Sequence, residues 1–376
     1  MQIPFVYGKI AERSAFINRK ADLTRLQNNF QALTHTILIS PRRWGKSSLV
    51  KKAALAMVKS DKRYRVCFMD LNNARTESDF YKIYAETVIN STSTKLEDAV
   101  RSIKSFFKRV IPKISISPEA QSEISLSMDW NEIAKNPSEI LQLPERIAKR
   151  RKIKIILCLD EFQNIAQFRD PLAFQKTLRA HWQHHRQVVY CLYGSKRHMM
   201  MELFSSANMP FYKFGDLIFL QRIETEHWIK YIQNQFSRSG KGINRDLVQV
   251  LVGIVDSHAY YAQQLAQLVW LRTDKTCSAS TVSAAFEGLQ LQLSMPFQQI
   301  TGTLSTKQIR FLQALLDGAK GLSSQATIKK YRLGTSATVN KVKKALEDKE
   351  ILDLIGGGIS FNDPVYKHWL KNYYFR

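Results

Sequence analysis

The residues Ser40-Pro41-Arg42-Arg43-Trp44-Gly45-Lys46-Ser47 (SPRRWGKS) decide how this sequence is read. They follow a short apolar run at 36–39 and precede a segment, 47–58, in which apolar residues recur at helical spacing. Strand, loop and helix in this order are the context that a phosphate-binding loop of the form G-x-x-x-x-G-K-[ST] requires. The sequence departs from that motif at Ser40, which stands where the motif has its first glycine. The alternative is a basic surface turn that matches the motif by chance.

The loop predicts the groups that would hold ATP and Mg²⁺. Backbone N–H groups at the start of the helix favour phosphate oxygens, and Lys46 can reach the β- and γ-phosphates. The Ser47 hydroxyl is a suitable Mg²⁺ ligand, and Gly45 lets the backbone approach the phosphates without a Cβ clash. The predicted cofactor-binding residues of the loop are Pro41, Arg42, Arg43, Trp44, Gly45, Lys46, Ser47 and Ser48.

A second group of candidates follows the apolar run 154–159 (KIILCL), where the chain continues with Asp160 and Glu161. A carboxylate at the carboxyl end of a central strand can hold Mg²⁺, which is the role predicted for Asp160. Glu161 is predicted to act as the general base that polarises the attacking water. The alternative is an acidic pair at a strand end, which is common in α/β folds.

A third candidate is Ser195, which follows the apolar run 188–193 (VVYCLY). A hydroxyl on a strand next to that of Asp160 could position the water or contact the γ-phosphate. The alternative is an ordinary strand-to-loop turn. The predicted catalytic residues are therefore Glu161, Lys46 and Ser195.

Residues 1–222 alternate strand-like and helix-like segments, with further strand-like runs at 65–71 and 216–220. This alternation predicts an α/β domain with a parallel sheet covered on both faces. After a predicted helix at 96–110, two runs with period-two alternation predict a β-hairpin insertion at about 111–129, with its turn at Pro118 and Glu119.

The remainder of the chain predicts two further domains. Residues 223–300 are helical only and predict a helical lid, with Thr225 as the cap of its first helix. Residues 301–376 predict three helices followed by a short hairpin around Gly356-Gly357-Gly358, which is the pattern of a winged helix-turn-helix.

The helix predicted at 336–348 has an apolar face formed by Val339, Val342 and Leu346. Polar and basic residues lie away from that face, as expected of a recognition helix that meets the phosphates of duplex DNA. The candidate nucleic-acid residues are Asn340, Lys341, Lys343 and Lys344. An equal alternative is a module that binds a partner protein or inhibits the ATPase domain.

The basic run Arg146–Lys154 (RIAKRRKIK) has six cationic residues in nine. It is either a nucleic-acid patch or a solvated helix end that leads into a strand, and the second reading is the more common one.

Composition limits the class of protein. The 376 residues include 56 Lys and Arg against 32 Asp and Glu, a net charge of +24, which favours a polyanionic partner or reflects a lysine-rich proteome. A hydrophobic content of 44% excludes a mainly disordered chain. No apolar run approaches the roughly 20 residues of a membrane span, so no membrane is expected. The four cysteines show no metal-ligand spacing and predict core thiols in a cytoplasmic protein. The oligomeric state stays open.

Several stretches resemble the archaeal-type P-loop ATPase family of the broader AAA+/STAND group. They are the loop Pro41–Ser47, the D-E-F-Q segment ending at Gln163, the Gly194-Ser195 pair and the C-terminal D-P-x-x-x-x-W-L stretch at 363–370. Residues 16–23 resemble the N-terminal F-x-x-R-x-x-x-L element of that family, and this resemblance implies that Arg19 lies beside the adenine.

The resemblance implies an ATPase that binds ATP or ADP with Mg²⁺ and shifts its lid and winged helix on hydrolysis. Phe214 stands where many relatives have an arginine, and residues 257–261 lack the G-x-P of STAND-like lids. These departures imply slow hydrolysis. Arg222 or Arg197 could take the place of the missing arginine, but neither lies in a motif of the family. The alternative function is a winged-helix DNA-binding regulator whose ATPase domain senses nucleotide and is nearly inactive.

Overall fold

The computed structural model describes residues 3–10, 16–93, 115–118, 124–127, 137–354 and 358–376. The chain divides into two compact units, which are described separately. The α/β unit comprises Arg19–Arg42 and Lys46–Gln221. The helical unit comprises Met1–Asn18, Arg43–Gly45 and Arg222–Arg376.

A five-stranded parallel sheet forms the centre of the α/β unit, in the order β2-β5-β6-β1-β7. Its strands are β1 (Thr36–Ile39), β2 (Tyr64–Asp70), β5 (Lys154–Asp160), β6 (Val188–Gly194) and β7 (Asp216–Phe219). Each of the five predicted strands is present to within one residue at either end. The central strands β5, β6 and β1 are buried on both faces, which explains their continuous apolar sequences. The predicted fold class is confirmed.

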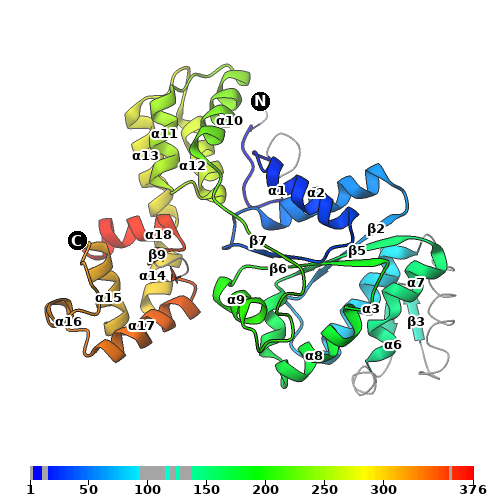
Figure 1. Ribbon diagram of the computed structural model, residues 1–376. Helices are drawn as coiled ribbons and strands as arrows, with labels where there is room; N and C mark the ends of the chain where they lie inside the picture. Colours follow the sequence, from blue (N-terminus) through cyan, green and yellow to red (C-terminus); the bar gives the residue numbers. More distant parts are fainter. Residues whose placement is uncertain (1–2, 11–15, 94–114, 119–123, 128–136, 355–357) are drawn as a thin grey trace. The chain divides into compact units, whose positions relative to one another are not determined.

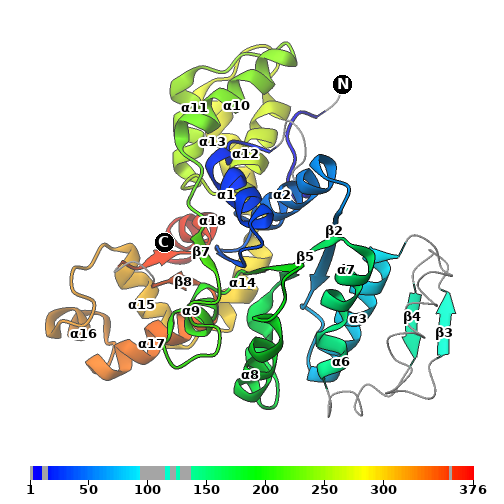
Figure 2. The ribbon, with the colours of Figure 1, turned by 45° about the vertical axis from the view of Figure 1, so that its right-hand side comes forward.

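Helices cover both faces of this sheet. Figures 1 and 2 show α1 (Lys20–Gln31) and α2 (Lys46–Ser60) on one face and α3 (Glu77–Thr92), α7 (Leu143–Arg151) and α8 (Pro171–Trp182) on the other. The chain crosses from β1 to β2 in one direction and returns through β5 and β6 in the other. Because such crossovers are right-handed, the two directions place their helices on opposite faces. Within the described residues, the unit also has the helices α6 (Ser138–Leu141), η2 (Phe162–Gln167) and α9 (Arg197–Ser205).

An aromatic cluster fills the face of the sheet that carries α8. Trp182 stacks on Tyr190 with ring centroids 4.2 Å apart, and Phe214 stacks on His35 at 4.4 Å. Phe214 is buried in this cluster, so the position at which the resemblance implies an arginine holds a core residue.

A small antiparallel pair lies where the sequence predicts an insertion. β3 (Ser115–Pro118) and β4 (Ile124–Ser127) pair with Ser115 opposite Ser127. The helix predicted at 96–110 and Glu119 of the predicted turn lie outside the described residues, and Pro118, the other predicted turn residue, is the last residue of β3.

The helical unit begins with α10 (Thr225–Arg238), α11 (Arg245–Ile254), α12 (Ala259–Arg272), α13 (Ala279–Gln292) and α14 (Ser294–Gly302). The predicted cap of α10 is wrong. Glu224 is the N-cap, without a side-chain cap, and Thr225 is already the first helical residue. The apolar face predicted for this helix is confirmed, because Trp228, Ile232 and Phe236 are all buried.

The unit continues with α15 (Thr306–Leu316), α16 (Gln325–Tyr331), α17 (Ser336–Asp348), β8 (Leu352–Asp353) and β9 (Ser360–Phe361). β8 and β9 pair antiparallel, so three helices and a short hairpin occur in the predicted order. The chain ends with α18 (Pro364–Trp369) and η3 (Leu370–Tyr374).

The N-terminal residues pack on α10 and α12 of the same unit. Pro4 accepts a hydrogen bond from Gln235 (2.6 Å), the Val6 N–H donates to Gln263 (3.3 Å), and the Phe5 ring lies 6.0 Å from that of Tyr231. The sequence did not predict this packing.

Among the described residues, no helix combines the length and apolar character needed to cross a membrane. All four cysteines are buried free thiols.

Candidate functional site

The loop between β1 and α2 has a backbone that accounts for its sequence. Gly45 has φ of +91° and Arg43 has φ of +64°, in the left-handed region that glycine tolerates best. Ser40 is not among the residues with positive φ, so a serine fits where the motif has glycine. Ser40 is fully buried, and its hydroxyl donates to the Pro41 carbonyl at 3.1 Å.

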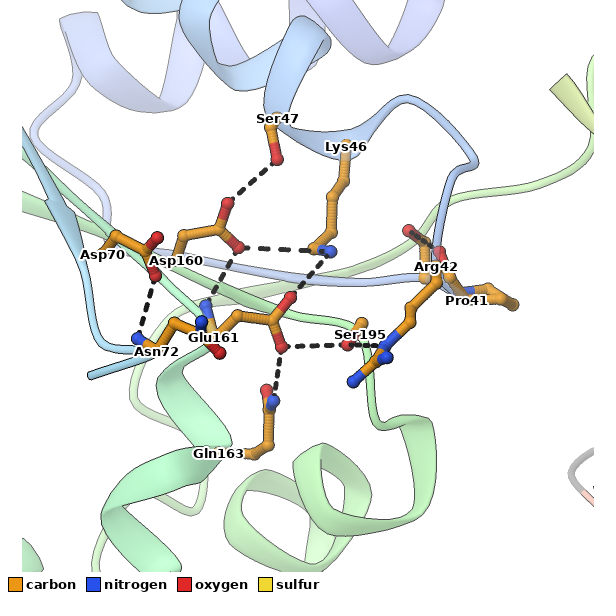
Figure 3. A network of polar contacts seen from close by, with 11 residues as sticks. Pro41, Arg42, Lys46, Ser47, Asp70, Asn72, Asp160, Glu161, Gln163 and Ser195 are labelled. Carbon is orange, nitrogen blue, oxygen red and sulfur yellow. Dashed lines mark hydrogen bonds and ion pairs between the residues drawn. The ribbon is translucent and has the colours of Figure 1, made fainter. Parts of the chain in front are cut away.

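The loop helix and strand β5 bring the principal candidates together (Figure 3). Lys46 and Ser47 open α2, Asp160 is the last residue of β5, and Glu161 follows it directly. The Ser47 hydroxyl donates to Asp160 Oδ2 at 2.9 Å. Lys46 Nζ lies 3.2 Å from Glu161 Oε1 and 4.0 Å from Asp160 Oδ1. Two segments more than 100 residues apart in the chain thus form one polar cluster.

Glu161 has further partners on its second oxygen. Ser195 Oγ donates to Glu161 Oε2 at 2.8 Å, and Gln163 Nε2 donates to the same atom at 2.5 Å. Arg42 Nε lies 3.4 Å from Ser195 Oγ. Ser195 therefore belongs to the cluster through Glu161, and Arg42 joins it from the loop.

The backbone at Glu161 is also constrained. Its φ of +52° is left-handed, which an L-residue with a full side chain rarely adopts. The Glu161 N–H donates to Asp160 Oδ1 at 2.9 Å, which fixes the two carboxylates relative to each other. Such strain concentrates at functional sites, where the surroundings hold it in place.

Burial and neighbouring charges shift the two carboxyl groups in opposite directions. Burial raises the pKa of Asp160 and outweighs the opposing effects of Lys46 and Ser47. Burial would also raise the pKa of Glu161, but Lys46, Gln163 and Ser195 together outweigh it, and that pKa is lowered. Glu161 is therefore ionised while Lys46 is its partner.

The chemistry of this donor set fits a nucleotide with Mg²⁺. A hydroxyl and a carboxylate, Ser47 and Asp160, are hard oxygen ligands of the kind Mg²⁺ takes. Lys46 is a buried cation, and the first turn of α2 presents backbone N–H groups to an anion. Pro41 and Ser48 are buried beside these residues.

Arg19 is buried at the start of α1, and its guanidinium donates to the Gln221 carbonyl at 2.5 Å. It also pairs with Asp22 at 3.5 Å. Burial lowers the pKa of Arg19 against the opposing effect of Asp22. The residue thus links the start of α1 to the end of β7, and its implied position beside an adenine stays a prediction.

Residues 43–45 belong to the helical unit, and two of them, Arg43 and Trp44, make cation–aromatic contacts within it. The Arg43 guanidinium lies 4.7 Å from the centre of the Tyr260 ring. The Arg222 guanidinium lies 5.5 Å from the centre of the half-buried Trp44 ring. Arg222, considered from the sequence as a substitute cation, therefore lies beside the loop residue Trp44.

The candidate nucleic-acid residues all lie on α17. Val339, Val342 and Leu346 are buried, as predicted, while Asn340, Lys341 and Lys344 are exposed and Lys343 is half-buried. Lys344 pairs with Glu347 at 3.3 Å and with Asp348 at 3.1 Å. Its charge is therefore less available to a phosphate than that of Lys341.

Sequence reasoning missed two residues of the cluster. It assigned no role to Gln163, and it gave no reason for a glycine at position 194. In the structure, a Cβ at Gly194 would lie 2.0 Å from Gln163 Oε1. The D-E-F-Q segment contained the signal for Gln163, because Gln163 lies only two residues after Glu161 in that segment. The contact between Gly194 and Gln163 had no sequence signal.

The sheet order, the loop and the carboxylate pair define the fold of P-loop ATPases. Residues 295–372 match the family model described as "Probable winged helix domain", which agrees with the C-terminal elements. The chain thus combines a P-loop ATPase fold with a C-terminal winged helix.

Solved structures show the same fold over nearly the whole chain. The Walker-type ATPase of Pyrococcus abyssi is 14% identical, with a TM-score of 0.67, over 98% of this chain and 99% of that one. The ORC2 protein of Aeropyrum pernix, solved in ADPNP-ADP complexes, is 12% identical, with a TM-score of 0.55, over 98% and 96%. The ORC1 protein of Aeropyrum pernix, solved in complex with DNA, is 10% identical, with a TM-score of 0.51, over 96% and 94%. At these identities the similarity concerns the fold alone. No curated protein matches the chain in sequence.

Proposed function

We propose that the chain binds ATP with Mg²⁺ and hydrolyses it. The observation that carries this proposal is the convergence of Lys46 and Ser47 from α2 with Asp160 and Glu161 at the carboxyl end of β5, all within 4.0 Å of a partner in the group. The fold shared with a Walker-type ATPase and with a nucleotide-bound ORC2 protein supports it.

Each residue has a proposed part in the reaction. Lys46 and the loop N–H groups hold the phosphates, and Ser47 and Asp160 hold the metal. Glu161 accepts the proton of the attacking water, and Ser195 orients Glu161 or that water. A bound Mg²⁺ supplies neutralisation of phosphate charge. Because Lys46 is paired with Glu161 at 3.2 Å, bound phosphates must compete with Glu161 for Lys46. When Lys46 moves to the phosphates, Glu161 is free to act as a base.

We further propose that hydrolysis changes the position of the helical lid, 223–300, and of the winged helix, 301–376, relative to the ATPase domain, 1–222. ATP and ADP are the proposed ligands, and duplex DNA or a partner protein is the proposed partner of the winged helix. The buried free thiols support a reducing, cytoplasmic location.

A second candidate function is a winged-helix DNA-binding regulator that senses nucleotide with little turnover. Phe214 favours it, because the position at which the resemblance implies an arginine is part of the aromatic core. The exposed Asn340 and Lys341 on α17 also favour it, since a recognition helix presents such residues to DNA.

Binding and turnover of ATP test both functions. Lys46→Ala removes a charge-assisted contact worth roughly 1.5–3 kcal/mol, so ATP–Mg²⁺ should bind about 10- to 150-fold more weakly. Lys59→Ala is the matched control, because Lys59 is an exposed lysine in the last turn of the same helix. Equal affinity in the two variants would overturn the loop assignment.

Phosphate release with and without duplex DNA then separates the two functions. The ATPase proposal expects steady turnover that Lys46→Ala abolishes. The regulator expects nucleotide binding, DNA binding and almost no phosphate release.

A further inference from the structure

A basic hollow lies at the edge of the sheet opposite the phosphate-binding loop. Its volume is about 290 Å³, and Arg63, Lys149, Lys152, Lys154 and Gln187 are among the residues that line it. It lies where β2, β5 and β6 begin, because Tyr64 is paired with Lys154 and Ile155 with Val188. In a parallel sheet the ends at which strands begin lie opposite the carboxyl ends that carry Asp160 and Ser195.

Three segments of the chain are joined by backbone hydrogen bonds at this hollow. The Lys154 N–H donates to the Arg63 carbonyl, and the Ile155 N–H donates to the Gln187 carbonyl, both at 2.9 Å. The cationic residues of these segments, together called the basic edge, are Lys62, Arg63, Arg65, Lys149, Arg150, Arg151, Lys152, Lys154 and Arg186. They include most of the basic run noted in the sequence, together with residues far from it in the chain.

Acidic partners neutralise only part of the basic edge. Asp61 pairs with Arg63 at 2.8 Å, and Glu145 pairs with Lys149 at 3.2 Å. Lys62, Lys152 and Arg186 are exposed, and none of them has an acidic partner within the part of the chain that the structure describes. These three exposed cations belong to the same edge of the sheet as the hollow, which is itself lined by basic residues. Together they form a surface that favours a polyanion.

We propose that the basic edge binds the phosphate backbone of duplex DNA, in addition to any contact that the winged helix makes. Duplex DNA carries one phosphate charge per about 1.7 Å of helix axis, so neighbouring cations can meet successive phosphates. Such contacts position a protein on DNA without reading its sequence. The choice of DNA rests on the proposed function of the winged helix, whose helix-turn-helix enters the major groove of a duplex.

The side chains of the basic edge favour a duplex over a single strand. Single-strand binding uses exposed aromatic rings on which bases stack. The aromatic residue here is Tyr64, which is 3% exposed, with Lys154 Nζ 5.4 Å from its ring centre. Among the described residues of these segments, no exposed aromatic ring is therefore present for a base to stack on.

The same comparison disfavours an acidic membrane. Binding at a bilayer surface combines cations with apolar side chains that enter the interface. The exposed large hydrophobic residues of the described chain include none in 61–65, 145–154 or 185–187. The basic edge is cationic without an apolar wedge.

Salt-dependent duplex binding by the full chain tests the proposal. The edge variant combines Lys62→Gln, Lys152→Asn and Arg186→Gln, and it leaves the Arg63–Asp61 and Lys149–Glu145 pairs in place. Asparagine is chosen at 152 because Lys152 has φ of +53°, which asparagine tolerates. The control variant combines Lys82→Gln, Lys176→Gln and Lys230→Gln, which removes the same charge from exposed positions on α3, α8 and α10.

The slope of log affinity against log salt for a labelled duplex of mixed sequence should become shallower by about 0.9 for each lost phosphate contact, or about 2–3 in the edge variant. The control variant should keep the wild-type slope. Equal slopes in the two variants overturn the proposal, as does wild-type protein that binds no duplex at low salt.

Single-stranded DNA and lipid vesicles test the other possible ligands of the basic edge. A loss confined to single-stranded DNA, or to vesicles that contain phosphatidylserine, also overturns the proposal. A Lys341→Ala/Lys343→Ala variant distinguishes the two DNA surfaces. If only that variant flattens the slope, the winged-helix interface stands and the basic edge is excluded. Because ATP does not enter this measurement, a protein without ATPase activity leaves the test intact.

Discussion

At the scale of single residues, Glu161 is constrained through both its backbone and its side chain. It combines a left-handed backbone with contacts to Lys46, Gln163 and Ser195. We expect Glu161→Gln to retain ATP–Mg²⁺ binding, because Lys46, Ser47 and Asp160 are unchanged. Turnover should fall by roughly 10²–10⁴-fold, because the amide cannot accept the proton. Equilibrium binding and phosphate release, measured on the same preparation, check this.

Asp160→Asn supplies the contrast to that variant. It removes a carboxylate that we assign to Mg²⁺, so the Mg²⁺-dependent part of the nucleotide affinity should fall together with turnover. A Glu161→Gln protein that hydrolyses ATP at the wild-type rate would contradict the general-base assignment.

Gly194 tests the support of Glu161 from the neighbouring strand. A Cβ at this position would lie 2.0 Å from Gln163 Oε1, so Gly194→Ala must displace the side chain that holds Glu161 Oε2. We expect turnover to fall about tenfold or more while ATP affinity changes little. In the Gln163→Ala background, Gly194→Ala should cost little further turnover, because the clashing amide is gone and the remaining close atom, Met200 Sδ at 2.9 Å, belongs to a flexible side chain. Additive losses in the double variant would place the effect of Gly194 elsewhere.

The sequence predicted those residues of the site that a local pattern defines. Lys46 and Ser47 follow from the loop motif, and Asp160 and Glu161 from their place after a buried strand. The contacts of Gln163 with Gly194 and of Glu161 with Ser195 depend on the pairing of β5 with β6, and no spacing within either segment encodes them. Local sequence patterns therefore predicted the residues with candidate chemical roles. The residues that position them were visible only in the tertiary structure.

At the scale of elements, the strands were predictable because a strand buried on both faces is apolar throughout. β5 and β6 are such strands. The start of α10 was predicted wrongly because a threonine before an apolar helical face is equally compatible with the N-cap and with the first helical position. In the structure Glu224 has extended backbone angles, φ −59° and ψ 143°, and the helix begins after it.

The ion pairs of α17 sharpen a test of its DNA contact. Lys344 is paired with Glu347 and Asp348, whereas Lys341 is exposed and has no acidic partner within the described ranges. Lys341→Ala with Lys343→Ala should flatten the salt dependence of duplex binding by about 2, at 0.9 per phosphate contact. Lys344→Ala alone should change the slope little. A slope that ignores the double variant would favour a partner protein as the ligand of this helix.

At the scale of the whole molecule, the half-buried His35 and the buried His185 predict sensitivity to acid. Burial lowers the pKa of His35 and of His185 to about 4, from an unfolded value near 6.5. The unfolded chain therefore binds more protons between these values, and stability falls as the pH drops from about 6.5 to about 4. Each histidine contributes a slope of at most about 1.4 kcal/mol per pH unit in that window.

Unfolding by denaturant at several pH values measures that slope. His185→Gln should reduce it, whatever the variant does to stability at neutral pH. His184→Gln is the control, because His184 is the exposed neighbour of His185. An unchanged slope in His185→Gln would mean that another group governs acid unfolding.

The order of strands in the sheet has a consequence for synthesis on the ribosome. β1 pairs with residues 191–194 of β6 and 216–219 of β7, and with no other strand of the sheet. The strand that precedes the phosphate-binding loop is therefore synthesised about 150 residues before its first neighbour in the sheet. Long-range pairing of this kind is slow and leaves strand edges open to wrong partners. The proposed nucleotide site is thus among the last parts of the α/β unit to form, and we expect a nascent chain that stops before β6 not to bind ATP through it.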